Sequence, residues 1–461
     1  MPRKESYIKR QTRKLSSGKI DRRRFVMSAI ASGVTMPTAM SLAAKAQAQV
    51  PRSGGHFRYG VGFALGGPDA TRARFATLIN STLGSCLTEI AIDGSVEGAL
   101  AKTFEASNGA RTWTFGLRDG VTFHNGQPLT AKDVVTTIAS HPLLGAEGPL
   151  HQVDQILADG PMRITIHLNT PDPQFDRRMA DPRLVIYPDP GNDTDRQPGI
   201  GTGAYRLIHH DAGKRAILER NPDHWRRDRG FFDTVELLSM PDTAMRQSAV
   251  MNGEVDFIDK VDPRSVALLG RVPTLRILES EGGGRYGFPI PTQIAPFDNP
   301  GLSKALSLAI DQRELVEKIL LGHGSVACAG AAHDHGGRGT SFDPAAARRA
   351  YLASGHQGRI ALAASDTVFP GAVAAARLIA ASAQKAGIQI DVIDTEDQGG
   401  WRMRASDNVT SLVEQSAIDV EGLQIKTNDI HAHSAALAHK PVVGANLRTD
   451  VGKIAERWWF A

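Results

Sequence analysis

The sequence predicts a mixed α/β protein with at least two domains, and three observations lead to this prediction. Stretches that alternate apolar and polar residues, as strands do, are interspersed with stretches of helical spacing along most of the chain. The composition is 41% hydrophobic and 22% charged, which is typical of a folded globular protein. The length of 461 residues exceeds what one hydrophobic core usually serves, so two or three domains are expected.

The positive charge of the chain is concentrated at its amino terminus. Residues 1–48 contain 11 of the 53 Lys and Arg residues but only 2 of the 49 Asp and Glu residues. The remaining chain holds 42 basic and 47 acidic residues, so its balance is mildly acidic. Once residues 1–48 are set aside, no basic excess points to a nucleic-acid partner.

Residues 1–48 resemble a twin-arginine export signal. Arg22 and Arg23 precede Phe25 and a mildly apolar run that reaches residue 42, followed by the small-x-small site at residues 46–48. The run is too short and too polar for a membrane span, which needs about 20 strongly apolar residues. We therefore expect cleavage before Gln49 and a soluble mature chain in the periplasm.

Cysteine usage is sparse. Cys86 and Cys328 are the only two cysteines, and neither has the spacing of a zinc site or a disulfide framework. Because neither lies at the end of the signal, a lipid-modified amino-terminal cysteine is excluded, and the mature chain is expected to be unanchored.

The local patterns predict the following elements in order. Strands are expected at residues 55–61, 111–117, 121–123, 163–168, 205–207, 215–220, 282–288 and 388–393, with the second and third forming a hairpin. Helices are expected at residues 72–87, from Ala131 with Thr130 as N-cap and Asp133 completing a capping box, at 245–251, at 302–320, and in a run from Arg404.

Six ordered segments then resemble the extracytoplasmic solute-binding proteins of peptide-type ABC transporters, the dipeptide, oligopeptide and nickel class. They are WTFGLRDGVTFHNGQPLTAKDVV at residues 113–135, GTGAYRL at 201–207, LERNPDHW at 218–225, MNGEVD at 251–256, PFDN at 296–299 and the helix at 305–322. Parts of the tail from residue 432 onward look like one branch of the same family. The resemblance covers most of the mature chain.

The resemblance implies a two-lobed periplasmic binding protein fold of the peptide-binding type, with an extra N-terminal subdomain. The first lobe would comprise residues 49–78, 195–280 and 425–461, the inserted subdomain residues 79–194, and the second lobe residues 281–424. It implies a monomer without a cofactor that captures a peptide or peptide-like solute and delivers it to the permease subunits of an ABC importer. The flexible stretch at residues 199–203 would serve the crossing between lobes.

Candidate ligand-contacting residues follow from the same resemblance. Phe63 and Leu65, in the Gly-rich loop after the first strand, would form one wall, although the glycines could equally permit a turn with Phe63 in the core. Tyr286 and Phe288 would bring a strand to the second wall, where such aromatics are as often core. Trp401 and Asn428 are weaker candidates.

The chain departs from the family between residue 393 and the tail, where a sizeable segment is absent. That segment usually helps to line the pocket and can supply an acidic residue for a peptide's ammonium, so unmodified di- and tripeptides are expected to bind weakly. The shortening leaves three possibilities open: a trimmed second lobe, a different ligand, or a decayed protein that no longer binds.

Two other functions compete with the binding role. His333 and His335 could chelate nickel or a metal complex, but two histidines in a Gly-rich loop are more often a solvated loop. No motif of a hydrolase, metalloprotease or nucleotide-binding site is present, so a peptidase is disfavoured and no catalytic residue is assigned.

Overall fold

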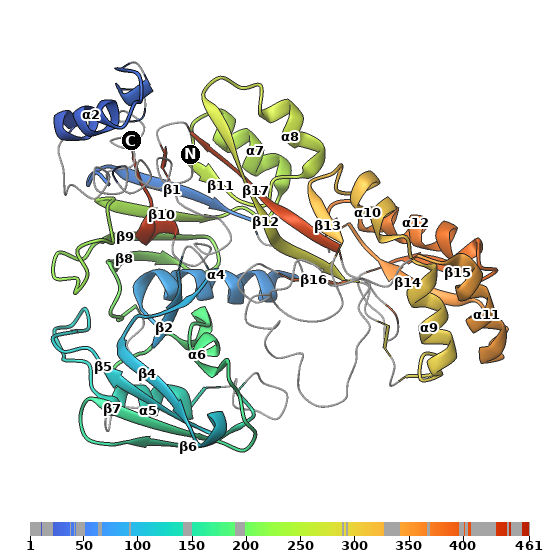
Figure 1. Cartoon of the computed structure of the whole chain (residues 1–461), viewed down its shortest axis with the longest axis horizontal. Helices are drawn as coiled ribbons and strands as arrows, with labels where there is room; N and C mark the ends of the chain where they lie inside the picture. Colours follow the sequence, from blue (N-terminus) through green and yellow to red (C-terminus); the bar gives the residue numbers. More distant parts are fainter. Residues whose placement is uncertain are drawn as a thin grey trace.

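The computed structural model describes residues 11, 22–36, 38–40, 42, 51–62, 67–91, 94–141, 150–189, 199–287, 290–291, 294–326, 342–366, 369–395, 401, 404–406, 430–439, 442–443 and 454–460. In this part of the chain the elements form three groups (Figure 1). These are a first lobe built on a large sheet, an N-terminal subdomain with its own sheet, and a second lobe made mostly of helices.

The first lobe is built on the largest sheet, whose strands lie in the order β16-β12-β17-β11-β1-β10-β9-β8, with β13 paired to β17. Three neighbours, β10, β1 and β11, run parallel, and the other pairs are antiparallel. The strands are β1 (His56–Val61), β8 (Tyr205–Asp211), β9 (Arg215–Arg220), β10 (Thr234–Ser239), β11 (Phe257–Ile258), β12 (Leu275–Gly287), β13 (Gly324–Val326), β16 (Arg404–Ser406) and β17 (Ile430–His439).

Helices cover this sheet because its strands present large apolar side chains. The core includes Phe57, Phe232 and Phe257 together with Trp458, all at most 1% exposed. The helices of the first lobe are α4 (Gly67–Leu83), α7 (Thr243–Met251), α8 (Pro263–Leu269) and the short α15 (Ile454–Arg457), and the last of these is flanked by the strand pair β18 (Val442–Val443) and β19 (Trp459–Phe460).

The N-terminal subdomain has a four-stranded antiparallel sheet in the order β4-β5-β7-β6, which packs against helix α5 (Ala131–Ala139). The Asp133 carboxylate accepts a hydrogen bond from the Thr130 backbone at 2.7 Å, so the predicted capping box is confirmed. The strands are β4 (Ala101–Ser107), β5 (Thr112–Leu117), β6 (Val153–Ala158) and β7 (Arg163–Leu168); the hairpin β2 (Thr88–Ile90) and β3 (Val96–Gly98), α6 (Phe175–Arg178) and short 3-10 turns complete the group.

Among its described residues, the second lobe has four helices around a parallel pair of strands. Its small sheet joins β14 (Ile360–Ala364) to β15 (Ile390–Asp394), with Ile360 opposite Ile390. The helices are α9 (Pro300–Ala309), α10 (Gln312–Lys318), α11 (Pro344–Ser354) and α12 (Ala372–Gln384). Many small residues face the core, such as Ala305, Ala375 and Ala376, which lets the helices lie close together.

The chain passes between the lobes along β12 and β17, the long central strands in Figure 1. Their pairing is regular from Leu275 to Ser280, shifts register before Gly284, and then continues to Tyr286. A register shift of this kind is a β-bulge, which bends the strand that carries it. The bulge therefore lies where β12 leaves the first lobe.

Residues 199–203, in contrast, do not serve the crossing, so that prediction was wrong. A Cβ atom on Gly201 would lie 2.3 Å from the Leu83 carbonyl oxygen, and one on Gly203 would lie 2.6 Å from Leu83 carbonyl atoms. The glycines are there because α4 and this segment approach too closely for a side chain. The two glycines therefore allow close packing against the end of α4, and not a hinge between the lobes.

Three other local predictions were also wrong. Strand β5 forms its hairpin with β4 and not with residues 121–123, where only an isolated bridge from Thr122 to Pro128 occurs. The helix expected at residues 302–320 is two helices, because Asp311 caps α10 by accepting from the Arg313 and Glu314 amides. The helical run expected from Arg404 begins as strand β16, which pairs with β12.

Near the amino terminus the chain forms helix α2 (Arg22–Ala31), in which Phe25 and Ala29 pack against Ala39. Among the helices described, none combines the length and the apolar character needed to cross a membrane.

Candidate functional site

The first edge of the candidate site is formed by the parallel strands of the first lobe. Strands β10, β1 and β11 end side by side, since Val61 pairs with Ser239 and Gly60 pairs with Ile258. Ligands of open α/β sheets bind beyond the carboxyl ends of such strands. The chain segments that leave these three ends are therefore the first place to search for a site.

Polar contacts hold these segments in place. The Gly62 amide donates a hydrogen bond to the Asp259 carboxylate at 2.6 Å, which joins the chain after β1 to the chain after β11. Three residues further on, Asp262 caps α8 and pairs with the Arg264 guanidinium at 2.6 Å. The Arg264 side chain is 62% exposed, so its guanidinium is open to solvent while it pairs with Asp262.

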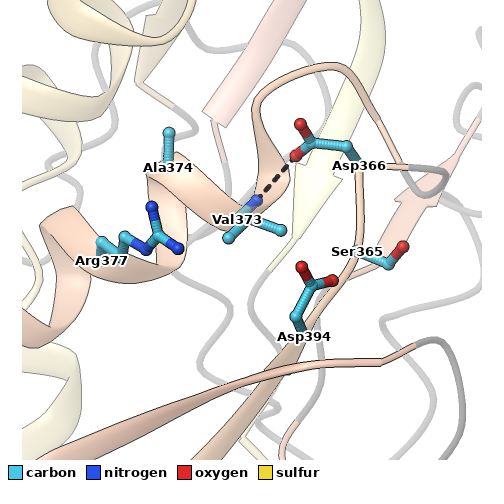
Figure 2. A pocket seen from close by; sticks show the side chains of 6 residues that line it. All are labelled: Ser365, Asp366, Val373, Ala374, Arg377 and Asp394. Atoms are coloured by element: carbon cyan, nitrogen blue, oxygen red, sulfur yellow. Dashed lines mark hydrogen bonds between the residues drawn. The ribbon is translucent and has the colours of Figure 1, made fainter.

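The second edge lies in the second lobe, where β14 and β15 also end side by side at Ala364 and Asp394. A hollow of about 550 Å³ opens there, and Figure 2 shows its lining. Two carboxylates and one guanidinium are among the lining groups, which are contributed by Ser365, Asp366, Val373, Ala374, Arg377 and Asp394. The hollow is thus charged and can take a polar solute group.

Asp366 also stabilises the start of helix α12, in addition to placing a negative charge in the hollow. Its carboxylate accepts a hydrogen bond from the Val373 amide at 3.0 Å (Figure 2). Val373 lies in the first turn of α12, where the N-cap residue Gly371 has no side chain to offer. Asp366 therefore caps α12 from the preceding loop.

Electrostatics relate the two edges to each other. The pKa of Arg264 is raised mainly by its hydrogen bond and charge interaction with Asp262, and the negative charge of Asp366 adds to the increase. Asp366 belongs to the hollow of the second lobe and Arg264 to the edge of the first. Asp366 accordingly contributes to the raised pKa of Arg264, but less than Asp262 does.

The site residues predicted from sequence are placed as follows. The Tyr286 ring is half-buried and stacks on Phe369, with centroids 4.0 Å apart. Trp401 is 2% exposed, packs against Phe297 with centroids 6.1 Å apart, and accepts a hydrogen bond from the Ala363 amide through its carbonyl oxygen. Both rings contact the core of the second lobe, and their contact with a ligand stays a prediction.

The structure does not describe the other site residues predicted from the sequence. Phe63, Leu65, Phe288 and Asn428 lie outside the described residues, and so do His333 and His335. Across the residues that the structure describes, no three His, Cys, Asp or Glu side chains are grouped as a metal site would require.

Sequence reasoning missed Asp366, Asp394 and Arg264. A signal for the first two was present, because Asp366 lies just after one short strand, Asp394 ends the next, and a helix lies between the two strands. Such a β-α-β pattern predicts parallel strands whose carboxyl ends meet. Arg264 had no comparable signal, since its relation to Asp366 depends on how the lobes pack.

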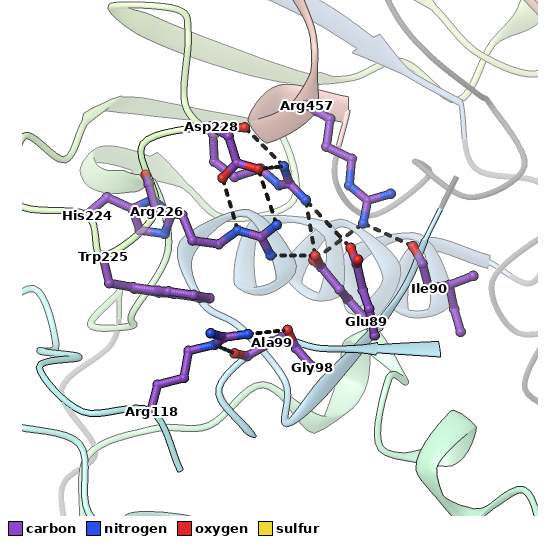
Figure 3. Close-up of polar contacts among 12 residues, drawn as sticks. Glu89, Ile90, Gly98, Ala99, Arg118, His224, Trp225, Arg226, Asp228 and Arg457 are labelled. Atoms are coloured by element: carbon purple, nitrogen blue, oxygen red, sulfur yellow. Dashed lines mark hydrogen bonds and ion pairs between the residues drawn. The ribbon is translucent and has the colours of Figure 1, made fainter. Parts of the chain in front are cut away.

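Buried charges attach the subdomain to the first lobe (Figure 3). Glu89 on β2 is 8% exposed and lies 2.6 Å from Arg226, 3.1 Å from Arg229 and 3.4 Å from Arg457. Burial alone would raise the pKa of Glu89, but the three guanidinium groups lower it far below its usual value. This cluster joins the subdomain to loop and tail residues of the first lobe.

Comparison with known proteins places the chain in a family. Residues 95–418 match the family described as bacterial extracellular solute-binding proteins, family 5 middle, and because the match spans most of the chain, the protein belongs to this family. Among curated relatives, the oligopeptide-binding protein OppA of Bacillus subtilis is 24% identical over 272 residues, which is 51% of this chain and 48% of OppA. The chain spans about half the length of the curated relatives it matches.

Solved structures agree on the fold. The periplasmic binding protein DppA of Helicobacter pylori, in complex with the peptide STSA, aligns with a TM-score of 0.72 at 17% identity, covering 90% of this chain and 99% of DppA. NikZ of Campylobacter jejuni, in complex with Ni(L-His), aligns with a TM-score of 0.68 at 14% identity, covering 88% of this chain and 99% of NikZ. The predicted two-lobed fold of the peptide-binding type is thus confirmed.

Proposed function

We propose that this chain is the periplasmic solute-binding component of an ABC importer, and that it captures a peptide or peptide-like solute. It holds the solute between its lobes and delivers it to permease subunits in the inner membrane. Family membership supports the binding role. The names of relatives such as the oligopeptide-binding protein support the solute class.

One observation carries the proposal. Each lobe has a set of parallel strands whose carboxyl ends lie side by side, and strands β12 and β17 cross from one lobe to the other. Arg264 and the hollow containing Asp366 provide groups of opposite charge on the two sides. A solute that contacts both sides stabilises the closed state relative to the open one. The bulge between Ser280 and Gly284 gives β12 a place to bend during closure.

Within this proposal, aromatic residues and Leu65 form the walls that receive solute side chains. Phe63 and Leu65 lie on the first-lobe side, and Tyr286, Phe288 and Trp401 on the second-lobe side, with Asn428 as a polar contact. The lobes keep the boundaries expected from the sequence, with residues 79–194 as the inserted subdomain and residues 281–424 as a shortened second lobe. The exceptions are the end of α4, which belongs with the first lobe, and β13 and β16, which pair within the large sheet. The protein works as a monomer without a cofactor and without enzymatic activity.

The precursor reaches the periplasm through the twin-arginine machinery in this proposal. Arg22 and Arg23 begin α2, and the positive charges at this end suit an export signal. Cleavage before Gln49 leaves the mature chain without a lipid anchor.

A thermal-unfolding experiment on the mature protein tests the function. A solute that binds the native state raises the melting temperature according to its concentration and affinity. The probes are a library of peptides of two to six residues, with free or acetylated amino termini, and Ni²⁺ alone. We expect a shift with peptides that the double variant His333→Ala/His335→Ala retains. A shift with Ni²⁺ only, lost in that variant, would replace the peptide proposal with metal binding.

A further inference from the structure

Arg246, on α7, lies beneath the edge formed by the three parallel strands of the first lobe. Only 3% of the residue is exposed. Burial lowers the pKa of its guanidinium, and the nearby Asp259 carboxylate offsets part of the decrease. A cation is costly to bury, so its position calls for a reason beyond packing.

The contacts of the guanidinium reach the ends of all three strands. One terminal nitrogen donates to the Met240 and Pro241 carbonyl oxygens at 2.5 and 2.8 Å, directly after β10. The other donates to the Lys260 carbonyl oxygen at 3.2 Å, two residues after β11, where Lys260 has a φ of 51°. It also contacts the Thr243 hydroxyl at 3.3 Å.

The third strand meets the same guanidinium through Gly62, directly after β1. A Cβ atom at position 62 would lie 2.5 Å from Arg246 Cζ, which is closer than two carbon atoms can approach without displacement. Gly62 therefore allows the backbone to lie against the guanidinium, while its amide is fixed by Asp259.

We propose that Arg246 is a positioning residue for the first-lobe side of the solute site. By holding the chain after β10, β1 and β11 in one arrangement, it sets the positions of Gly62 and of residues 259–262, which lead into α8. The inference rests on the proposed function and extends it, because it identifies the residue that shapes one wall without touching the solute.

Arg246→Met tests this role, with Arg118→Met as the matched control. Arg118 also uses its guanidinium on backbone carbonyl groups, those of Ala99 at 2.6 Å and Gly98 at 2.9 Å, but in the subdomain. In hydrogen exchange of the mature protein without solute, we expect Arg246→Met to raise exchange at Gly62 and at residues 259–262 by roughly tenfold, as loss of one or more hydrogen bonds predicts. Exchange in β5 should stay unchanged.

A second readout measures solute binding. The peptide-induced thermal shift should fall in Arg246→Met and persist in Arg118→Met, even where both variants lose similar intrinsic stability. Should Arg246→Met fail to fold, Arg246→Lys takes its place, since an ammonium group keeps the charge but cannot hold all the carbonyl groups in the same geometry. Gly62→Ala should likewise raise exchange at the strand ends and reduce the peptide-induced thermal shift. These changes should be smaller when Gly62→Ala is made in an Arg246→Ala background, because both substitutions act through the same contact.

Unchanged exchange at the strand ends in Arg246→Met, or Arg246→Lys if it replaces it, would overturn the proposal. So would an unchanged peptide-induced shift. If the native protein shows no shift with any peptide, the proposed function fails, and the exchange pattern still decides whether Arg246 positions the strand ends.

Discussion

The Tyr286 ring lies flat on the Phe369 ring, with centroids 4.0 Å apart and planes inclined by 6°. Tyr286 is on β12, the strand that leaves the first lobe, and Phe369 precedes α12 in the core of the second lobe. The contact therefore fixes the far end of the crossing strand to the lobe that it enters. Bending during closure is left to the bulge between Ser280 and Gly284.

Replacing Tyr286 should weaken this anchor. We expect Tyr286→Ala to lower the free energy of unfolding by about 3 kcal/mol, because the stacked ring and its packing are lost. Tyr286→Phe keeps the ring and should cost less than about 1 kcal/mol. Urea denaturation of both variants measures the difference, and equal stability of Tyr286→Ala and the native protein would show that the stack contributes nothing.

Local signals predicted much of the fold. The alternation at residues 55–61 and 163–168 gave β1 and β7, and the Thr130 and Asp133 pair gave the start of α5. Strand β16 was missed because it is held by pairing with distant β12. Similarly, Asp366 caps α12 from outside the helix, and Arg264 meets the charge of Asp366 only through lobe packing, so neither relation follows from spacing along the chain.

Gly201 should be among the least tolerant glycines of the chain. Gly201→Ala would place Cβ 2.3 Å from the Leu83 carbonyl oxygen, so the backbone must shift. We expect a loss of about 3 kcal/mol or more in the free energy of unfolding. The control is Gly126→Ala, which has open space but a φ of +85° and should lose only about 1 to 2 kcal/mol. Chemical denaturation that ranks the two variants in the opposite order would contradict the close-packing account.

Glu89 should make the stability of the protein dependent on acid. Its pKa is lowered in the folded state, so its contribution is fully present above the unfolded-state value of about 4.3 and is lost progressively as the pH falls from there toward the much lower folded-state pKa. At pH 7 Glu89→Gln should cost about 3 kcal/mol, because three arginines each lose a charged partner, although Asp228 still pairs with Arg226 and Arg229. The difference in the free energy of unfolding between Glu89→Gln and the native protein should become smaller below about pH 4.

The control for this prediction is Glu97→Gln. Burial and the neighbouring Glu89 raise the pKa of Glu97, and its contact with Arg229 is a distant 4.0 Å. This variant should therefore cost much less at pH 7. Urea titrations at pH 3.5, 5 and 7 measure both variants, and a cost for Glu89→Gln that does not vary with pH would refute the charge-based explanation.

Export should depend on the arginine pair at the start of α2. Changing Arg22 and Arg23 together to Lys should leave full-length precursor inside the cell, because the twin-arginine route requires the pair that this segment resembles. Amino-terminal sequencing of the exported native protein should begin at Gln49. Immunoblots of cell fractions give the result, and normal export of the double variant would exclude the twin-arginine route.

Native mass spectrometry of the protein purified from its own periplasm tests the binding role most directly. The account predicts one bound molecule per chain, with the mass and fragmentation of a peptide or peptide-like solute, that is released when the protein unfolds. Recovery of the bare chain alone, or of a chain that carries only a metal ion, would contradict the account.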